Sequence, residues 1–114
     1  SPGDLVLIPF PFSDLETAKR RPVLALTCPD RHGDFIGLAL TSVPQSPPNI
    51  RIDTSHLSDG SLPKVSWVRV DKVFTIDHRL ALKRLGRLTQ TTLERTLGAL
   101  CEQVGYHVRQ NSTV

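Results

Sequence analysis

The sequence predicts a mainly β fold, a small and strongly curved antiparallel barrel with a C-terminal α-helix packed against it (α+β). Three observations lead to this prediction. Short apolar runs bounded by turn residues occupy the first two-thirds of the chain. Two further stretches alternate polar and apolar residues, which is the period of a half-buried strand. The last third carries an apolar stripe at helical spacing.

Five strands are expected, separated by loops rich in proline or in small polar residues. The segment 43–48 contains three prolines, which lack the backbone N–H that a strand donates, so it is expected to form an exposed loop. Residues 54–63 are mostly small and polar, and they are also expected to form a loop. The strands are expected at residues 6–8, 23–27, 35–41, 49–53 and 66–70.

Two helices are expected near the end of the chain. Asp77 is placed to cap a short helix over residues 78–83, with Gly86 as its stop. Thr89 is placed to cap a longer helix that ends at Gly105. The apolar stripe of this longer helix, which is expected to cover the open side of the barrel, consists of Leu93, Leu97, Leu100, Cys101 and Val104.

Length and composition limit the class of protein. A chain of 114 residues can bury one core but not two, so residues 1–114 are expected to form a single domain. No apolar run approaches the roughly 20 residues of a membrane helix, so no membrane partner is expected. Cys28 and Cys101 are expected to be buried thiols rather than a disulfide, and the absence of an export signal predicts a cytoplasmic protein.

Positive charge is concentrated in the second half of the chain. Residues 61–114 hold nine Lys and Arg against four Asp and Glu, an excess of +5 within a net charge of +3. This excess suits a polyanionic partner, although an ordinary solvated surface gives the same count. Charge alone therefore does not decide the function.

The sequence lacks the motifs of the common cofactor and metal enzymes. No glycine-rich phosphate loop follows a strand, and no His-Glu-x-x-His or paired Cys-x-x-Cys marks a metal site. The four histidines are scattered, and no serine has an evident histidine and acid to complete a hydrolase triad. We therefore expect no cofactor and no metal.

The most informative feature is a group of three cations, Lys19, Arg20 and Arg21, at the start of the second expected strand. Arg21 directly precedes Pro22, whose ring fixes its own φ and pushes the preceding residue towards an extended conformation. The guanidinium is therefore held on a rigid strand start. Its planar fork of donors matches phosphate oxygens and keeps its charge at working pH. Such an arginine is suited to stabilising charge that develops on a phosphate.

Four blocks of sequence follow one another with fitting gaps. They are Gly-Asp-Leu-Val-Leu-Ile at 3–8, Arg-Pro-Val-Leu-Ala-Leu at 21–26, Gly-Leu-Ala-Leu-Thr-Ser at 37–42 and Ser-Trp-Val-Arg-Val-Asp-Lys-Val-Phe-Thr-Ile-Asp at 66–77. Leu-Gly-Arg-Leu at 85–88 and the final expected helix complete the pattern. Over residues 3–106 the chain thereby resembles the PemK/MazF family of type II toxins, which are mRNA interferases.

The resemblance implies an SH3-like barrel, a homodimer and neutralisation by a cognate antitoxin protein. It also implies an endoribonuclease that cuts single-stranded RNA, including mRNA, without a metal and through attack of the 2′-hydroxyl. Arg21 and Thr41 match the functional pair of the family, and Glu16 matches a glutamate that many members carry five residues before the arginine. We further expect the RNA groove to run along the dimer interface, because one small barrel offers little concave surface.

Other residues are expected to bind the RNA on either side of this pair. Cations would hold flanking phosphates, and Trp67 would stack a base, although a single Trp on an alternating strand is more often in a core or an interface. The loop 13–20 lacks the glycine-rich stretch that is common in the family, which leaves the RNA sequence that is cut undetermined. The expected RNA-binding residues are Lys19, Arg20, Ser42, Lys64 and Trp67.

Two alternative functions stay open. The same barrel occurs in toxins that block DNA gyrase without cutting nucleic acid, so the chain would then be a binding module. It would otherwise be an inactive RNA-binding relative. The intact pair of Arg21 and Thr41 argues against both, because a module that cuts nothing has no need of it.

Overall fold

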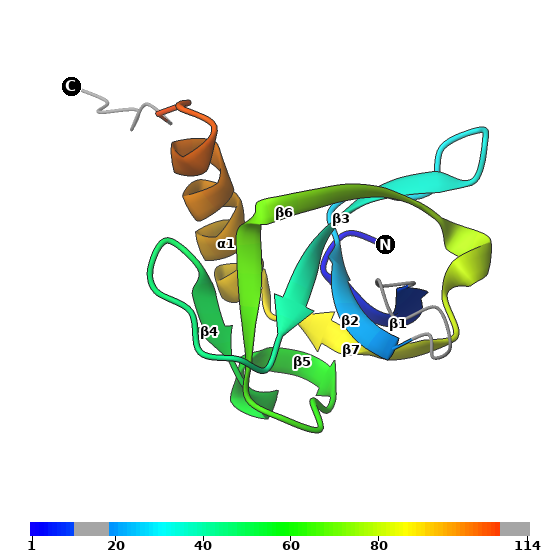
Figure 1. Cartoon of the computed structure of the whole chain (residues 1–114), viewed down its shortest axis with the longest axis horizontal. Coiled ribbons are helices and arrows are strands. Elements are labelled where there is room, and N and C mark those ends of the chain that lie inside the picture. Colours follow the sequence, from blue (N-terminus) through cyan, green and yellow to red (C-terminus); the bar gives the residue numbers. More distant parts are fainter. Residues whose placement is uncertain (11–18, 108–114) are drawn as a thin grey trace.

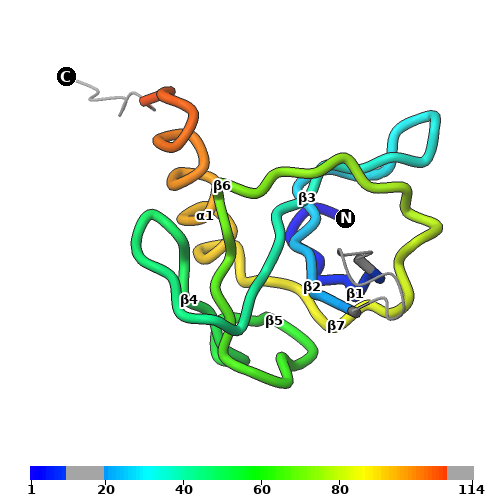
Figure 2. Tube along the Cα trace, viewed as in Figure 1, coloured from blue at the N-terminus to red at the C-terminus, as the bar shows by residue number. Residues whose placement is uncertain are grey.

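The computed structural model describes residues 1–10 and 19–107 and, within them, the side chains of all but Phe10 and Lys19. Seven strands form one antiparallel sheet in the order β4-β6-β3-β2-β1-β7-β5, and one α-helix follows it (Figures 1 and 2). The strands are β1 (Asp4–Phe10), β2 (Lys19–Ala25), β3 (Asp34–Thr41), β4 (Ile50–Ile52), β5 (Leu57–Gly60), β6 (Ser66–Asp77) and β7 (Lys83–Leu88), and the helix is α1 (Gln90–Gln103). Each of the five strand predictions falls on a strand.

The sheet curls because its longest strand bends. β6 pairs with β3 throughout, but the register shifts between Leu38 and Leu40, which face Val73 and Val68 respectively. The extra residues of β6 form a bulge, and a bulge bends the strand that carries it. Figure 1 shows the result: β6 runs beside β4, turns and continues across the top of the molecule with β3. The predicted curved antiparallel fold with a C-terminal helix is confirmed.

Both faces of the central strands are buried, in two separate clusters. On β2, Leu24 belongs to the larger cluster, while Val23 and Ala25 belong to the smaller one, as the alternation of a strand requires. The smaller cluster consists of Ile8, Val23, Ala25, Phe35 and Ile76. The larger consists of Leu5, Leu24, Leu38, Leu40, Ile50, Ile52, Leu62, Val68, Val70, Leu88 and Leu93.

The prediction of a plain loop at 54–63 is wrong. This segment contains a 3-10 turn, η1 (Thr54–His56), and then β5, which pairs with β7 at the sheet edge. Gly60 and Gly86 face each other where the two strands meet, and a Cβ on either glycine would collide with the backbone of the other strand. Gly60 also has a φ of +79°, which glycine adopts without strain. The two glycines therefore let β5 lie close against β7.

The predicted helix over 78–83 is only partly correct. Asp77 does cap a helical turn by accepting a hydrogen bond from the Arg79 backbone N–H (2.9 Å), but the turn is a 3-10 helix, η2 (His78–Leu80), and ends at Leu80. Gly86 is not a helix stop, because it lies inside β7. Pairing with β1, which a single sequence does not display, makes this segment a strand.

The C-terminal helix begins as predicted but buries a different face. The Thr89 Oγ1 accepts a hydrogen bond from the Thr92 backbone N–H (3.2 Å), which confirms the cap. Leu93 is buried, whereas Leu97 is 37% exposed and Val104 is 69% exposed. Thr92 and Thr96 are buried in their place; the Thr96 hydroxyl donates to the Thr92 carbonyl (2.9 Å), which satisfies it inside the core.

Leu100 and Cys101 are half-buried, so the predicted stripe covers the sheet only along part of its length. The outer end of α1 extends beyond the sheet in Figure 1, which accounts for the exposure of Val104. Cys28 and Cys101 are both free thiols, as predicted, but the expectation that both are buried is wrong, because Cys28 is exposed. Among the described helices, none is long and apolar enough to cross a membrane.

Candidate functional site

Arg21 and Thr41 both lie at one end of the sheet, just beyond the last pair of β2 and β3. The pairing of β2 with β3 ends at Val23 and Ala39. The same register continued by two residues places Arg21 opposite Thr41. Pro22 has no N–H with which to extend the ladder, so the strand pairing stops just before these two residues.

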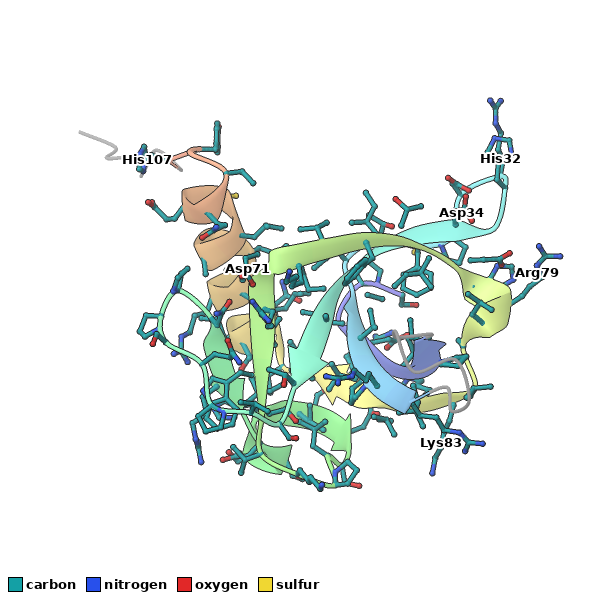
Figure 3. The ribbon with its side chains drawn as sticks, viewed as in Figure 1. His32, Asp34, Asp71, Arg79, Lys83 and His107 are labelled. Atoms are coloured by element: carbon teal, nitrogen blue, oxygen red, sulfur yellow. The ribbon has the colours of Figure 1, made fainter. Side chains whose placement is uncertain are left out.

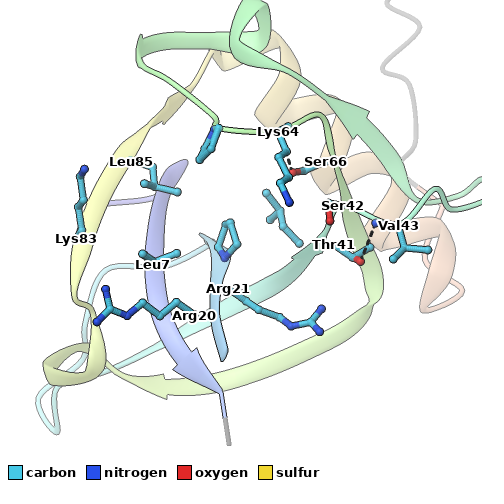
Figure 4. A pocket seen from close by; sticks show the side chains of 13 residues that line it. Leu7, Arg20, Arg21, Thr41, Ser42, Val43, Lys64, Ser66, Lys83 and Leu85 are labelled. Atoms are coloured by element: carbon cyan, nitrogen blue, oxygen red, sulfur yellow. Dashed lines mark hydrogen bonds between the residues drawn. The ribbon is translucent and has the colours of Figure 1, made fainter. Parts of the chain in front are cut away.

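A pocket with a volume of about 660 Å³ opens at this end of the sheet (Figure 4). In this view Arg21 and Thr41 lie on one side, Arg20 and Lys83 lie on the other, and Lys64 reaches in from above. The complete lining is Leu7, Arg20, Arg21, Pro22, Leu40, Thr41, Ser42, Val43, Pro63, Lys64, Ser66, Lys83 and Leu85.

The pocket is strongly positive. Four of the lining side chains are cations and none is a carboxylate, within the part of the chain that the structure describes. The remaining lining is apolar or carries a hydroxyl, so the charges sit around a low-polarity floor. Such a surface attracts a polyanion and has hydrogen-bond donors for its oxygens.

Arg21 and Thr41 have the chemistry of a phosphate-binding pair. Arg21 is half-buried and its Nε atom is shielded from solvent, so its position is restrained by the surrounding protein. The Thr41 Oγ1 accepts a hydrogen bond from the Val43 backbone N–H (3.2 Å). This contact uses a lone pair of the hydroxyl and leaves its O–H to donate to a ligand oxygen.

Lys64 is carried on a segment with its own anchors. The Ser66 Oγ donates to the Lys64 carbonyl oxygen at 3.0 Å. Two residues before Lys64, the Leu62 backbone N–H donates to the Thr54 Oγ1 at 3.0 Å. The exposed Lys64 side chain therefore projects from a fixed backbone.

The structure brings five of the sequence-predicted residues into this pocket, namely Arg20, Arg21, Thr41, Ser42 and Lys64. Glu16 lies outside the described residues. For Lys19 only its backbone place is described, at the start of β2 opposite Phe10. No group of three or more His, Cys, Asp or Glu side chains that could hold a metal occurs among residues 1–10 and 19–107.

Trp67 does not line the pocket. It pairs with Thr41 on one side and with Arg51 on the other, so the three side chains form a row on one face of the sheet. Its neighbours Ser66 and Val68 point to the other face and are buried. The half-buried ring therefore lies beside Thr41 and outside the pocket.

Sequence reasoning missed Lys83, together with the apolar floor of Leu7, Pro22 and Leu85. Lys83 is more than 60 residues from Arg21 in the chain, and only the pairing of β7 with β1 brings it to the pocket. The sequence contained no local signal for it, since Lys83 sits in a segment that was predicted to end a helix.

Fold and site together define a small, mainly β protein with a cationic pocket whose donors suit phosphate oxygens. The chain belongs to the family of PemK-like, MazF-like toxins of type II toxin–antitoxin systems, whose model matches residues 1–104. The family predicted from the sequence is thereby confirmed. Among curated proteins, no sequence match is found.

Solved structures share the fold. The Mycobacterium tuberculosis toxin MazF-mt6 matches with a TM-score of 0.74 and 16% identity, over 92% of this chain and 99% of the other. An endoribonuclease from mycobacterial species matches with a TM-score of 0.71 and 19% identity, over 95% and 93%. The MazE–MazF complex from Deinococcus radiodurans matches with a TM-score of 0.68 and 22% identity, over 93% and 95%.

Proposed function

We propose that this toxin is an endoribonuclease that cuts single-stranded RNA, including mRNA. The observation that carries the proposal is that Arg21 and Thr41 line one pocket together with three further cations, Arg20, Lys64 and Lys83. None of the described residues that line this pocket is a carboxylate. Family membership supports it, as do structural neighbours that are themselves named endoribonucleases.

RNA supplies its own nucleophile in this reaction. The 2′-oxygen attacks the adjacent phosphorus, the bond from phosphorus to the 5′-oxygen breaks, and a 2′,3′-cyclic phosphate and a 5′-hydroxyl result. The proton of the 2′-hydroxyl passes to a base, and a proton is delivered to the departing 5′-oxygen. The protein has to orient the chain, stabilise the charge on the phosphorane and move these protons.

Arg21 is the residue that stabilises the phosphorane. Its guanidinium stays charged at working pH and can donate to two phosphate oxygens at once. The Thr41 hydroxyl donates to a non-bridging oxygen. Glu16 is our candidate for the base, because a carboxylate a few residues before Arg21 matches the family pattern.

The other predicted residues hold the RNA on both sides of the reacting phosphate. Lys19, Arg20 and Lys64 neutralise neighbouring phosphates, and Ser42 donates from the position next to Thr41. Trp67 stacks a base on the sheet face that also carries Thr41. The RNA therefore follows the end of the sheet from β2 towards β6.

The assembly around this site is also a proposal. We place the protein in the cytoplasm, where its RNA substrate lies, as a single domain that forms a homodimer with the RNA groove along the interface. Neutralisation by a cognate antitoxin is supported by the family and by neighbours solved as MazE–MazF complexes. Sedimentation at micromolar concentration tests the dimer; a monomer that still cleaves RNA would remove it.

The test of the activity is cleavage of a mixed RNA by the purified protein in EDTA, followed by sequencing of the new 5′ ends. We expect cuts at a short motif with 5′-hydroxyl ends. Activity that disappears with the chelator and returns with magnesium would overturn the metal-free mechanism. A protein inert towards every RNA that still arrests growth would favour the gyrase-blocking alternative.

A further inference from the structure

One row of pocket residues crosses four strands. Lys83 of β7 pairs with Leu7 of β1, and Leu7 pairs with Pro22 of β2. The register between β2 and β3, continued by one residue, places Leu40 next in the row. Paired side chains share a face, and adjacent strands lie about 4.8 Å apart. The row is therefore a shelf of three apolar residues with a lysine at one end.

The shelf lies between two groups of cations. Figure 4 shows Lys83 and Arg20 at one side of the pocket and the Arg21 side chain extending to the other, with Leu7 and Leu85 between them. Leu7 and Pro22 are half-buried, so they offer surface to a ligand, and buried Leu40 backs them. An apolar shelf of this width, in a pocket that Arg21 and Thr41 also line, has the shape and chemistry to take a nucleobase.

The shelf has a cation at the place where the edge of such a base would lie. Lys83 is exposed (Figure 3), and no carboxylate among the described residues lines the pocket beside it. A lysine ammonium has three donors and no acceptor, so it can bond only to acceptor atoms of a base. Uracil and guanine present a carbonyl oxygen at the edge where cytosine and adenine present an amino group.

We propose that Lys83 is a specificity-determining residue that selects a base with a carbonyl at this edge, uracil or guanine, on the shelf of Leu7, Pro22 and Leu40. This inference rests on the proposed RNA-cleaving function and deepens it. Arg21 and Thr41 act on the phosphate whatever the sequence is, whereas Lys83 contributes to which sequence is bound.

The test measures binding to RNA that cannot be cut. In 2′-O-methyl octamers of uridine or cytidine the 2′-oxygen is blocked, and the two bases are both pyrimidines that differ at the edge read by Lys83. Fluorescence anisotropy at one fixed salt concentration gives Kd for each. We expect the unchanged protein to bind the uridine octamer at least about tenfold more tightly than the cytidine octamer, which is the value of one hydrogen bond to a charged donor.

The Lys83→Met variant keeps the apolar stem and removes the donors. Its ratio of affinities for uridine and cytidine should fall to within twofold of one. Lys83→Arg keeps the donors and should retain a preference for uridine. Lys72→Met, an exposed lysine of β6 that does not line the pocket, is the matched control and should keep the full ratio. Thermal unfolding verifies that each variant is folded.

Equal affinity of the unchanged protein for the two octamers, or a ratio that Lys83→Met leaves intact, would overturn the proposal. Cleavage of unmodified RNA is measured in parallel. If the protein cuts RNA but its ratio of affinities for uridine and cytidine does not depend on Lys83, the role of Lys83 is overturned and the endoribonuclease activity is supported. If the ratio depends on Lys83 but the protein cuts no RNA, base selection by Lys83 stands and the endoribonuclease activity is overturned. If the protein neither binds nor cuts RNA, both proposals are overturned.

Discussion

Lys83 and Arg84 are neighbours in β7, yet they belong to two regions with opposite electrostatic roles. Lys83 lines the pocket with three other cations, and no carboxylate lines it within residues 1–10 and 19–107. The Arg84 guanidinium instead donates to both oxygens of Asp59, at 2.8 Å and 3.0 Å, and to Asp4 at 3.3 Å. The Arg87 Nε adds a bond of 2.9 Å to Asp4. Two adjacent positive charges thus have different surroundings: one lines the pocket, and the other holds β5 and β1 together through ion pairs at the edge of the sheet.

These ion pairs lower the pKa of both carboxylates, Asp59 and Asp4. Hydrogen bonds from Arg84 lower the pKa of Asp59. Burial raises the pKa of Asp4, but hydrogen bonds, that from Arg87 first among them, more than offset it, and the pKa of Asp4 lies below its ordinary value. The comparison teaches that the number of cations in β7 says little about function. What matters is which of them have a carboxylate opposite.

The largest expected effect falls on the pocket. Arg21→Ala removes the charge that faces the phosphorane, and loss of such a donor costs about a hundredfold or more in cleavage rate. Arg21→Lys should restore little of the cleavage rate, because an ammonium is a point charge and lacks the planar pair of donors of a guanidinium. Thr41→Val keeps the shape and should also lower cleavage with the fold intact.

The double variant of Arg21 and Thr41 should be scarcely worse than either single variant if both act on the same transition state. Single-turnover kinetics on one RNA oligonucleotide measures the unchanged protein and the four variants. Near-normal cleavage by both single variants would show that the reaction occurs elsewhere.

The glycine contact that holds β5 against β7 should be the most sensitive structural position. Gly86→Ala places a methyl group against the Asp59 carbonyl and should cost about 1–3 kcal/mol or more in the free energy of unfolding. Gly98→Ala is the control, since a Cβ there meets nothing within 4 Å in α1, and it should be neutral or stabilising. Urea unfolding measures both, and equal stabilities would contradict the close contact.

The ion-pair region should affect stability and leave the chemistry alone. Asp4 has a side chain only 12% exposed and accepts from two arginines, so Asp4→Asn should cost about 1–3 kcal/mol at neutral pH. Because the pKa of Asp4 is lowered on folding, its contribution is present above the unfolded pKa near 4 and is lost as the pH falls through the folded value. The difference between the two proteins should therefore shrink below about pH 4. A constant difference would argue against the charged form.

The smallest expected effect is on the salt dependence of RNA binding, which should differ between variants of the pocket and variants of the ion-pair region. Arg20→Ala should weaken RNA binding and reduce the slope of log K against log salt concentration by about 1, because one phosphate contact is removed. Arg84→Ala should leave that slope unchanged, since its guanidinium is committed to Asp59 and Asp4. Titrations of one RNA at several salt concentrations decide this; equal slopes in the two variants would erase the distinction between the regions.

Local sequence determined the strands, the cap of α1 and the arginine of the site. Alternation and apolar runs located five of the seven described strands, because burial on a sheet leaves a period of two. Thr89 marked the start of α1, because a hydroxyl there satisfies a backbone N–H of the first turn. The Arg21–Pro22 pair and the family pattern selected Arg21 and Thr41, and the structure places both in one pocket.

Tertiary pairing decided the rest. β7 is a strand because it pairs with β1, and β5 is a strand because it pairs with β7. Gly86 resembled a helix stop because its close contact, Gly60, is distant in sequence. The buried face of α1 contains Thr96 rather than Leu97, since the direction in which the helix crosses the sheet selects the face. Lys83 reaches the pocket and Arg84 the carboxylates through the register of β7 on β1. The alternation within a strand shows which of its residues face the core, but it does not show which distant segment will lie beside it.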